Sequence, residues 1–245
     1  MSYVGGKAKA HFIIDILNHP AFDGMDYIEP FVGYAHILRR VERKRSYTAS
    51  DSHPLLITLL QSLHRGDPMP GHISRQRYDQ LRLSGENSLE AAVACFAFSF
   101  NGKAWGGYSP TYTRRSGRVD DQAGSRLKYY KLLQNSPHFK ASNISLSDYK
   151  DHTPTNSLVY CDPPYRNTQG YKGTSFDSDE FWQTATKWSE GNIVLVSEYV
   201  APHDWVCIAQ SPKQATLAGG HKQVPRHEKL YVHASRLPHP ALSPV

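Results

Sequence analysis

The tetrapeptide Asp162-Pro163-Pro164-Tyr165 carries the groups needed to hold an exocyclic amino group during chemistry. It follows the apolar run at 157 to 161, which we expect to form a buried strand that stops at a rigid turn. An arylamine nitrogen must pyramidalise before it attacks a methyl sulfonium, and two acceptors aimed at its N–H bonds favour that geometry. The Asp162 carboxylate and the Pro163 carbonyl would be these acceptors, because two successive prolines fix the backbone.

Tyr165 adds an aromatic face on which a base can stack, an interaction of about 1–3 kcal/mol at base-stacking platforms. The alternative interpretation is a plain tight turn after a strand. From average composition, the tetrapeptide arises by chance in on the order of one in a thousand chains of this length. In open α/β sheets the carboxyl ends of strands are where ligands bind. We therefore predict Asp162, Pro163, Pro164 and Tyr165 as catalytic residues.

A second group of residues follows two expected strands near the N-terminus. Glu29 ends the strand expected at 26 to 29, Phe31 follows it, and Gly33 would let the backbone approach a ligand closely. Asp51 ends the next expected strand, where an acidic side chain often accepts both ribose hydroxyls in nucleotide-binding α/β folds. The alternative role of Asp51 is to cap the helix that follows it.

The elements that would position these groups alternate as in a parallel sheet. In the first part of the chain we expect strands at 26–29 and 47–51 and helices at 8–19, 35–42 and 54–63, the last with proline in its first turn. After 150 we expect a strand ending at Asp162, a helix at 179–188, and strands at 192–197 and 229–233.

Between residues 65 and 150 the alternation breaks, and helices are expected at 89–98 and 125–133. The sequence thus predicts an α/β, Rossmann-like sheet with an inserted, mostly helical segment. We expect residues 1–64 and 151–245 to form two parts of one catalytic domain, and 65–150 to be the insert.

Bulk properties narrow the classes of partner and compartment. A net charge of +6 and a pI near 9.1 indicate a polyanionic partner. Three cysteines, an odd number far apart, give neither a disulfide framework nor a metal-ligand spacing. We find no signal peptide and no apolar run long enough to span a bilayer, so a reducing cytoplasm is the expected compartment.

Taken in order, these segments resemble the Dam-type DNA adenine-N6 methyltransferases, most closely the compact phage-encoded branch. The shared order is Tyr-x-Gly-Gly-Lys at the start, Glu-Pro-Phe-x-Gly after the first strand, Asp at the end of the second, and Asp-Pro-Pro-Tyr much later. The segments 171–182, 196–202 and 228–232 are also similar to that branch. The resemblance covers nearly the whole chain and is weakest in the insert.

The resemblance implies S-adenosylmethionine as cofactor and assigns roles to matching residues. The residues implied to bind the cofactor are Tyr3, Lys7, Glu29, Phe31, Gly33, Asp51 and Asp162. Tyr165, with Tyr171, is implied to hold the flipped base. The family's loop usually has a second glycine where this chain has Ala35. Alanine there costs on the order of 1 kcal/mol if the position needs a positive φ, and nothing if it lies in a helix.

The family places target recognition in the insert, and residues 99 to 118 interleave aromatic and cationic side chains on a glycine-rich stretch. Cations there would neutralise phosphates or read guanine edges. An aromatic side chain, Tyr112 among the candidates, would fill the gap that an extruded base leaves. The alternative is a solvated basic loop that recognises nothing. The predicted DNA-binding residues are Asn101, Lys103, Trp105, Tyr108, Arg114, Arg115, Arg118, Arg126 and Lys128.

Three functional interpretations remain open at this point: methylation of adenine in DNA, methylation of another amino group, and binding without catalysis. The same acceptor pair would serve a methyltransferase acting on RNA or on cytosine N4, although Asp at 162 and the order of the motifs favour adenine in DNA. A non-catalytic DNA- or cofactor-binding relative is the third, and the intact Lys7, Asp162 and Tyr165 argue against it. We predict an enzyme that binds double-stranded DNA and S-adenosylmethionine, needs no metal or membrane, and is a monomer or a weak dimer.

Overall fold

The computed structural model describes residues 7, 10–164, 176–211, 227–237 and 239–243. The chain divides into two compact units, which are considered separately. Unit 1 comprises Met1–Lys9, Val32–Arg39 and Ser50–Ser147, and unit 2 comprises Ala10–Phe31, Arg40–Ala49 and Asp148–Val245. The sequences of both units are interleaved, because the chain passes from one to the other several times.

A seven-stranded, mostly parallel sheet has the strand order β5-β2-β1-β6-β7-β9-β8. Strand β1 pairs in parallel with β2 and β6, β6 pairs in parallel with β7, and β9 is antiparallel to both β7 and β8. This is the mostly parallel, Rossmann-like α/β sheet that the sequence predicted. The strands are β1 Asp26–Glu29, β2 Ser46–Asp51, β5 Ser142–Leu146, β6 Ser157–Cys161, β7 Ile193–Glu198, β8 Trp205–Gln210 and β9 Lys229–His233.

The strand order reverses between β1 and β6. From β1 the chain moves outward to β2 and β5, and it then returns to the other side of β1 to form β6. In open α/β sheets such a reversal opens a crevice at the carboxyl ends of the two strands, and ligands bind there. Glu29 ends β1 and Asp162 directly follows β6, so both carboxylates belong to this position.

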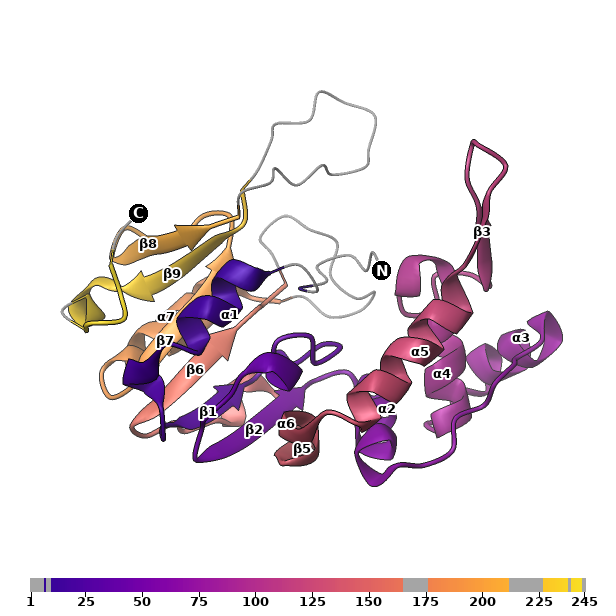
Figure 1. Cartoon of the computed structure of the whole chain (residues 1–245), viewed down its shortest axis with the longest axis horizontal. Coiled ribbons are helices and arrows are strands. Elements are labelled where there is room, and N and C mark those ends of the chain that lie inside the picture. The colour runs from indigo at the N-terminus through magenta and orange to yellow at the C-terminus, as the bar shows by residue number, and fades with distance from the viewer. Residues whose placement is uncertain (1–6, 8–9, 165–175, 212–226, 238, 244–245) are drawn as a thin grey trace. The chain divides into compact units, whose positions relative to one another are not determined.

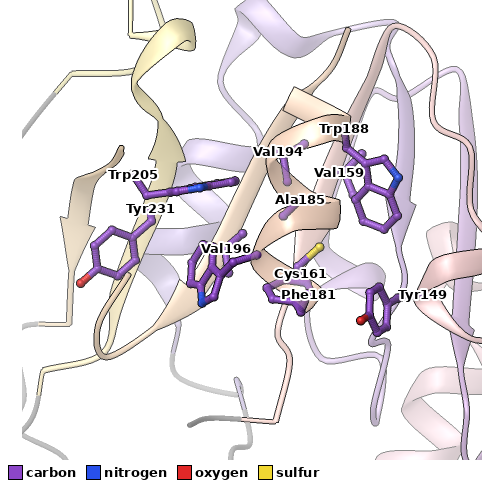
Figure 2. Packing of buried hydrophobic residues seen from close by; sticks show 11 residues of the cluster. Tyr149, Val159, Cys161, Phe181, Ala185, Trp188, Val194, Val196, Trp205 and Tyr231 are labelled. Carbon is purple, nitrogen blue, oxygen red and sulfur yellow. The ribbon is translucent and has the colours of Figure 1, made fainter. Parts of the chain in front are cut away.

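Unit 2 has a core on each face of its sheet. On one face, Phe181, Ala185 and Trp188 of α7 (Ser178–Ser189) pack against Val159 of β6 and Val196 of β7 (Figure 2). Because side chains alternate along a strand, the intervening residues of β6 point to the other face, and they too are fully buried. Helix α1 (His11–Leu17) lies on the face opposite α7 (Figure 1). Burial on both faces explains the continuous apolar sequences of β6 and β7.

Unit 1 is a helical cluster with one hairpin. Its helices are α2 Pro54–Arg65, α3 Arg75–Ser84, α4 Leu89–Ala97, α5 Gln122–Gln134 and the short α6 Pro137–Lys140, and the hairpin joins β3 Thr111–Thr113 to β4 Val119–Asp121 (Figure 1). Helix α4 is the centre of the cluster, since its residues 91–97 are all buried and it packs against α2, α3 and α5. Side-chain caps begin α3, α4 and α5 at Ser74, Ser88 and Asp121.

One predicted helix is wrong. The segment 35–42 contains only the three-residue 3-10 turn Leu38–Arg40. Gly33 and Ala35 have φ angles of 49° and 55°, and these left-handed conformations stop an α-helix from starting. The other predicted helices and strands are confirmed within a few residues, including Pro54 in the first turn of α2. None of the helices in the described residues is both long and apolar enough to cross a bilayer.

Candidate active site

Strand β6 delivers Asp162 to the carboxyl edge of the sheet. All five residues of β6 are buried, and Asp162 is half-buried directly after its end. Pro163 is buried and Pro164 is half-buried, so the turn is held by packing as well as by the fixed φ of proline. The turn therefore presents its carboxylate from a rigid support, as the sequence indicated.

Glu29 is the neighbouring carboxylate on the β1 side. The register pairs Ile28 with Val159, which places Glu29 beside Tyr160 and next to Asp162 along the edge. Only 2% of Glu29 is exposed, and its Oε2 accepts a hydrogen bond of 2.7 Å from the Tyr27 hydroxyl. Burial and the Glu29 carboxylate together raise the pKa of Tyr27 well above its ordinary value. Tyr27 thus stays protonated and holds this buried carboxylate in place.

The electrostatics of β6 reflect the same concentration of negative charge. Burial is the main cause of the strongly raised pKa of the Cys161 thiol, and the charges of Asp162 and Glu29 raise it further. The pKa of Tyr160 is raised by burial and then by Asp162, and its hydroxyl shares a 2.9 Å hydrogen bond with Ser197 Oγ. Two carboxylates from adjacent strands therefore act on one region, which suits a cationic ligand.

Glu198 is a third carboxylate at this edge, and the sequence analysis did not select it. It ends β7, which lies next to β6, and is 4% exposed. Its Oε1 accepts a hydrogen bond of 2.7 Å from the Tyr199 amide. The position of Glu198 at the end of an expected strand, as for Glu29 and Asp162, is the signal that could have identified it.

Phe31 is fixed in an aromatic cluster of unit 2. Its ring stacks on Tyr149 at a centroid distance of 5.3 Å and meets Phe181 edge-on at 5.6 Å. It also packs against the core cluster that contains Cys161, the residue before Asp162. Phe31 is therefore a rigid apolar wall, in agreement with a role beside an aliphatic part of a ligand, although its packing alone would also account for its presence.

In unit 1, Asp51 holds the loop that contains Gly33. Its Oδ2 accepts the Gly33 amide at 3.2 Å and its Oδ1 accepts the His53 amide at 3.0 Å. Burial raises the pKa of Asp51, against the opposing effect of these amides and that of Ser52. Asp51 does not cap α2, because His53 is the N-cap residue and its own side chain accepts the Leu56 amide. Three backbone amides thus use three of the about four acceptor sites of the carboxylate, so it can still accept one further hydrogen bond.

Some predicted residues cannot be placed in this geometry. Tyr3, Tyr165 and Tyr171 lie outside the described residues. Lys7 is described and is 6% exposed, within unit 1. In the described part of the chain, no group of three His, Cys, Asp or Glu side chains is arranged to hold a metal ion.

Two of the predicted DNA-binding aromatics support the structure of unit 1. Trp105 meets Tyr78 edge-on at 5.3 Å, and Tyr108 meets the same ring at 5.4 Å. The Tyr108 hydroxyl donates to the Ile73 carbonyl at 2.9 Å. Trp105 and Asn101 both adopt left-handed backbone conformations, with φ of 48° and 52°. Residues 101–108 therefore form a defined loop, whereas residues 111–118 of the hairpin are exposed to solvent.

Some of the predicted DNA-binding cations form contacts within the protein. Arg114 and Arg118 both pair with the Asp120 carboxylate across the β3–β4 hairpin. Arg126 donates to the carbonyls of Ala97 and Ser99 at 2.7 and 3.0 Å, so it also supports the fold. Lys103, Arg115 and Lys128 are exposed, and so are Arg114 and Arg118 despite their pairing with Asp120, whereas Arg126 is half-buried.

No protein-family model matches this chain, and no curated protein matches it in sequence. Similar solved structures include the rRNA methyltransferase AviRa from Streptomyces viridochromogenes, with 14% identity, coverage of 97% of this chain and 88% of that one, and a TM-score of 0.39. A conserved hypothetical protein from Streptococcus pyogenes has 11% identity, coverage of 91% and 93%, and a TM-score of 0.40. An rRNA methylase from Streptococcus thermophilus has 7% identity, coverage of 91% and 96%, and a TM-score of 0.38. At these values the likenesses say nothing of activity, and the fold assignment rests on the strand order and directions of the sheet.

Proposed function

We propose that this protein is an S-adenosylmethionine-dependent methyltransferase that methylates the N6 amino group of a flipped adenine in duplex DNA. The observation that carries the proposal is Asp162-Pro163-Pro164 at the end of a fully buried strand, at the point where the strand order reverses. That is where an open α/β sheet binds its ligands. The Asp-Pro-Pro-Tyr motif supplies the acceptors that methyl transfer to an amino group requires.

In the proposed reaction, Asp162 and the Pro163 carbonyl each accept one N–H of the adenine amino group. These two bonds hold the nitrogen in a pyramidal geometry and direct its lone pair at the methyl carbon. The N–C bond forms as the S–C bond breaks, and positive charge moves from sulfur to nitrogen. Asp162 stabilises that charge, and the nitrogen then releases one proton to water. Rigidity matters because neither acceptor has to reorganise during the step.

The residues at the sheet edge fit the cofactor by their chemistry. S-adenosylmethionine supplies an electrophilic methyl group on a positively charged sulfonium. Its cationic methionine end matches the buried carboxylate of Glu29, and the ring of Phe31 offers an apolar wall beside it. Asp51 would accept the ribose hydroxyls at the end of β2, and Lys7 and Tyr3 would complete the binding set.

We assign DNA binding to the insert at residues 65–150. The exposed Lys103, Arg115 and Lys128 would contact phosphates, together with the hairpin arginines Arg114 and Arg118. The net charge of +6 supports a polyanionic substrate. Tyr112, 44% exposed on the hairpin, is the aromatic candidate for the gap left by the extruded adenine, because Trp105 and Tyr108 are occupied in the loop.

The Asp162→Ala variant tests the chemistry. Without the carboxylate, one of the two acceptors is lost, and kcat should fall by about a hundredfold or more. Binding of duplex DNA, measured by fluorescence anisotropy, should change little, because the phosphate contacts remain.

Asp15→Ala is the matched control, since it removes an exposed carboxylate from α1 of the same unit. It should leave both kcat and DNA binding unchanged. Turnover by Asp162→Ala close to that of the unmodified chain would refute the mechanism.

A further inference from the structure

Unit 1 contains a cavity that the proposed reaction does not use. It has a volume of about 650 Å³ and lies between the β3–β4 hairpin, the first turns of α5 and the segment 34–36. Pockets for small ligands usually measure about 300–1,000 Å³. Every residue that lines this cavity belongs to unit 1, so it is described by that unit alone.

One side of the cavity is an aromatic surface. Tyr34, Tyr129 and Tyr130 line it, and each is at most 8% exposed. Tyr34 and Tyr130 lie nearly parallel, with ring centroids 6.4 Å apart and an interplanar angle of 19°. The Tyr34 hydroxyl donates to the Gly102 carbonyl at 3.0 Å, and the Tyr129 hydroxyl donates to the Tyr34 carbonyl at 2.8 Å. These bonds fix the rings in advance of any ligand, which lowers the entropic cost of binding a flat group against them.

The rest of the lining is charged and predominantly positive. Arg114, Arg118, Arg126 and Lys128 line the cavity together with the carboxylates of Asp120 and Asp121. The lining therefore has an excess of two positive charges. One of its cations, Arg126, is held rigidly, because its guanidinium also donates to Gln122 Oε1 at 2.9 Å.

A rigid aromatic surface next to an excess of cations fits a ligand that has a flat ring and a phosphate group. Stacking against aromatic rings accepts any base, and arginine and lysine bind phosphate oxygens. We infer that this cavity binds a nucleotide, and that in the enzyme this is a nucleotide of the substrate outside the methylated base. The assignment of this nucleotide to the substrate rests on the proposed function, whereas the binding of a nucleotide to the cavity does not.

Filling the cavity is the most direct test. Ser125 lines it from the exposed surface of α5, so Ser125→Trp should occupy the space without disturbing the core. Leu132→Trp is the matched control, because Leu132 is 50% exposed on the same helix and is not part of the lining. Lys128→Gln removes one exposed cation from the lining. Circular dichroism and thermal melting establish that each variant is folded.

Binding of thymidine 5′-monophosphate, thymidine and a single-stranded oligothymidylate to the full chain would be measured by isothermal titration calorimetry. We expect the monophosphate to bind more tightly than the nucleoside, Ser125→Trp to weaken it by about tenfold or more, and Lys128→Gln to weaken it less. Leu132→Trp should bind as the unmodified chain does. Equal affinity in Ser125→Trp and Leu132→Trp, or no nucleotide binding to the unmodified chain, would overturn the inference.

Two further readouts separate the source of the ligand from the proposed function. Tighter binding of the oligonucleotide than of the monophosphate, lost in Ser125→Trp, would support a nucleotide of a nucleic acid. Tighter binding of the free monophosphate would overturn that part of the inference. Methyl transfer to DNA is assayed separately, so a chain that binds nucleotide in the cavity but transfers no methyl group would refute only the proposed function.

Discussion

At the scale of single residues, Ala35 lies at a backbone position that disfavours it. Its φ of 55° is left-handed, and its side chain is fully buried in the segment between β1 and β2. The strain amounts to roughly 1–2 kcal/mol for an L-residue. Burial of the alanine methyl group stabilises the fold by about 0.8 kcal/mol, a contribution that a glycine would lack. These terms nearly cancel, so the departure from the family's glycine does not require a defective loop.

The balance predicts different results for two substitutions at this position. Ala35→Gly should change the free energy of unfolding by no more than about 1 kcal/mol, because strain relief is offset by the lost methyl and by backbone entropy. Ala35→Val should lower it by about 2 kcal/mol or more, since a β-branched residue is strongly disfavoured at positive φ.

Urea denaturation provides the free energies of unfolding, and Ala49→Val is the matched control. Ala49 is equally buried but lies in β2, where valine fits the extended backbone. Ala49→Val should therefore cost less than Ala35→Val. Equal losses of stability in the two variants would mean that steric crowding, and not the backbone conformation, disfavours valine at position 35.

Tyr27 provides a second prediction at this scale. Its buried hydroxyl donates to Glu29, which we propose to bind the cationic end of the cofactor. Tyr27→Phe leaves that buried carboxylate with one donor fewer, at a cost of about 1–3 kcal/mol in stability. A displaced Glu29 should raise the KM for S-adenosylmethionine several-fold more than it lowers kcat.

Tyr47→Phe is a suitable comparison for this variant. Tyr47 lies in the same unit with its ring edge-on to Tyr27 at 6.3 Å, but its hydroxyl accepts from the Lys44 amide, whereas the Tyr27 hydroxyl donates to the Glu29 carboxylate. Steady-state kinetics should show little change for Tyr47→Phe. An unchanged KM in Tyr27→Phe would mean that Tyr27 serves the fold alone.

The sequence predicted that Glu29 and Asp162 lie at strand ends, but it did not predict their neighbours, for a physical reason. Local pattern shows that each ends a strand, and strand ends at a parallel sheet's carboxyl edge converge. The order and register of neighbouring strands determine which hydroxyl reaches Glu29, and they place Glu198 at the same edge. Neither is encoded in a short window of sequence.

At the scale of elements, buried strands were predicted better than edges and loops. Strands β6 and β7 have continuous apolar sequences because both faces of the sheet are covered. Strand β5 and helix α3 were missed, since their sequences are polar: α3 buries only Tyr78 and Leu81. The helix predicted at 35–42 does not form because Gly33 and Ala35, at its expected start, have left-handed backbone conformations. An apolar sequence pattern does not reveal such conformations.

The β3–β4 hairpin is the element on which the DNA-binding proposal can be tested. Arg115 is exposed near its tip, whereas Arg114 and Arg118 share Asp120. Arg115→Ala should weaken duplex binding, and the slope of log K against log salt should decrease by about 1 if it contacts one phosphate.

The salt dependence would be measured by fluorescence anisotropy between low and physiological salt. Arg45→Ala removes the same charge from unit 2, where Arg45 pairs with Asp26. Its slope should stay unchanged. If both variants had the slope of the unmodified chain, Arg115 would not contact phosphate.

At the scale of the whole molecule, the alternation of strands and helices was sufficient to predict the α/β sheet. The strand predicted at 229–233 is confirmed as β9, but its antiparallel direction and the edge strand β8 were not predicted, because they depend on long-range pairing of β9 with β7 and of β8 with β9. The chain passes between the two units several times. The predicted division at residues 65 and 150 stays a prediction.

The central claim is that the protein transfers a methyl group to adenine in DNA. Purified protein would be incubated with S-adenosylmethionine carrying a labelled methyl group and with unmethylated duplex DNA, and the DNA would then be digested to nucleosides. We predict label in N6-methyladenine for the unmodified chain, and label that appears about a hundredfold more slowly or not at all for Asp162→Ala. Label in N4-methylcytosine, or label in RNA and not in DNA, would contradict the proposed substrate, and cofactor binding without any transfer would contradict catalysis itself.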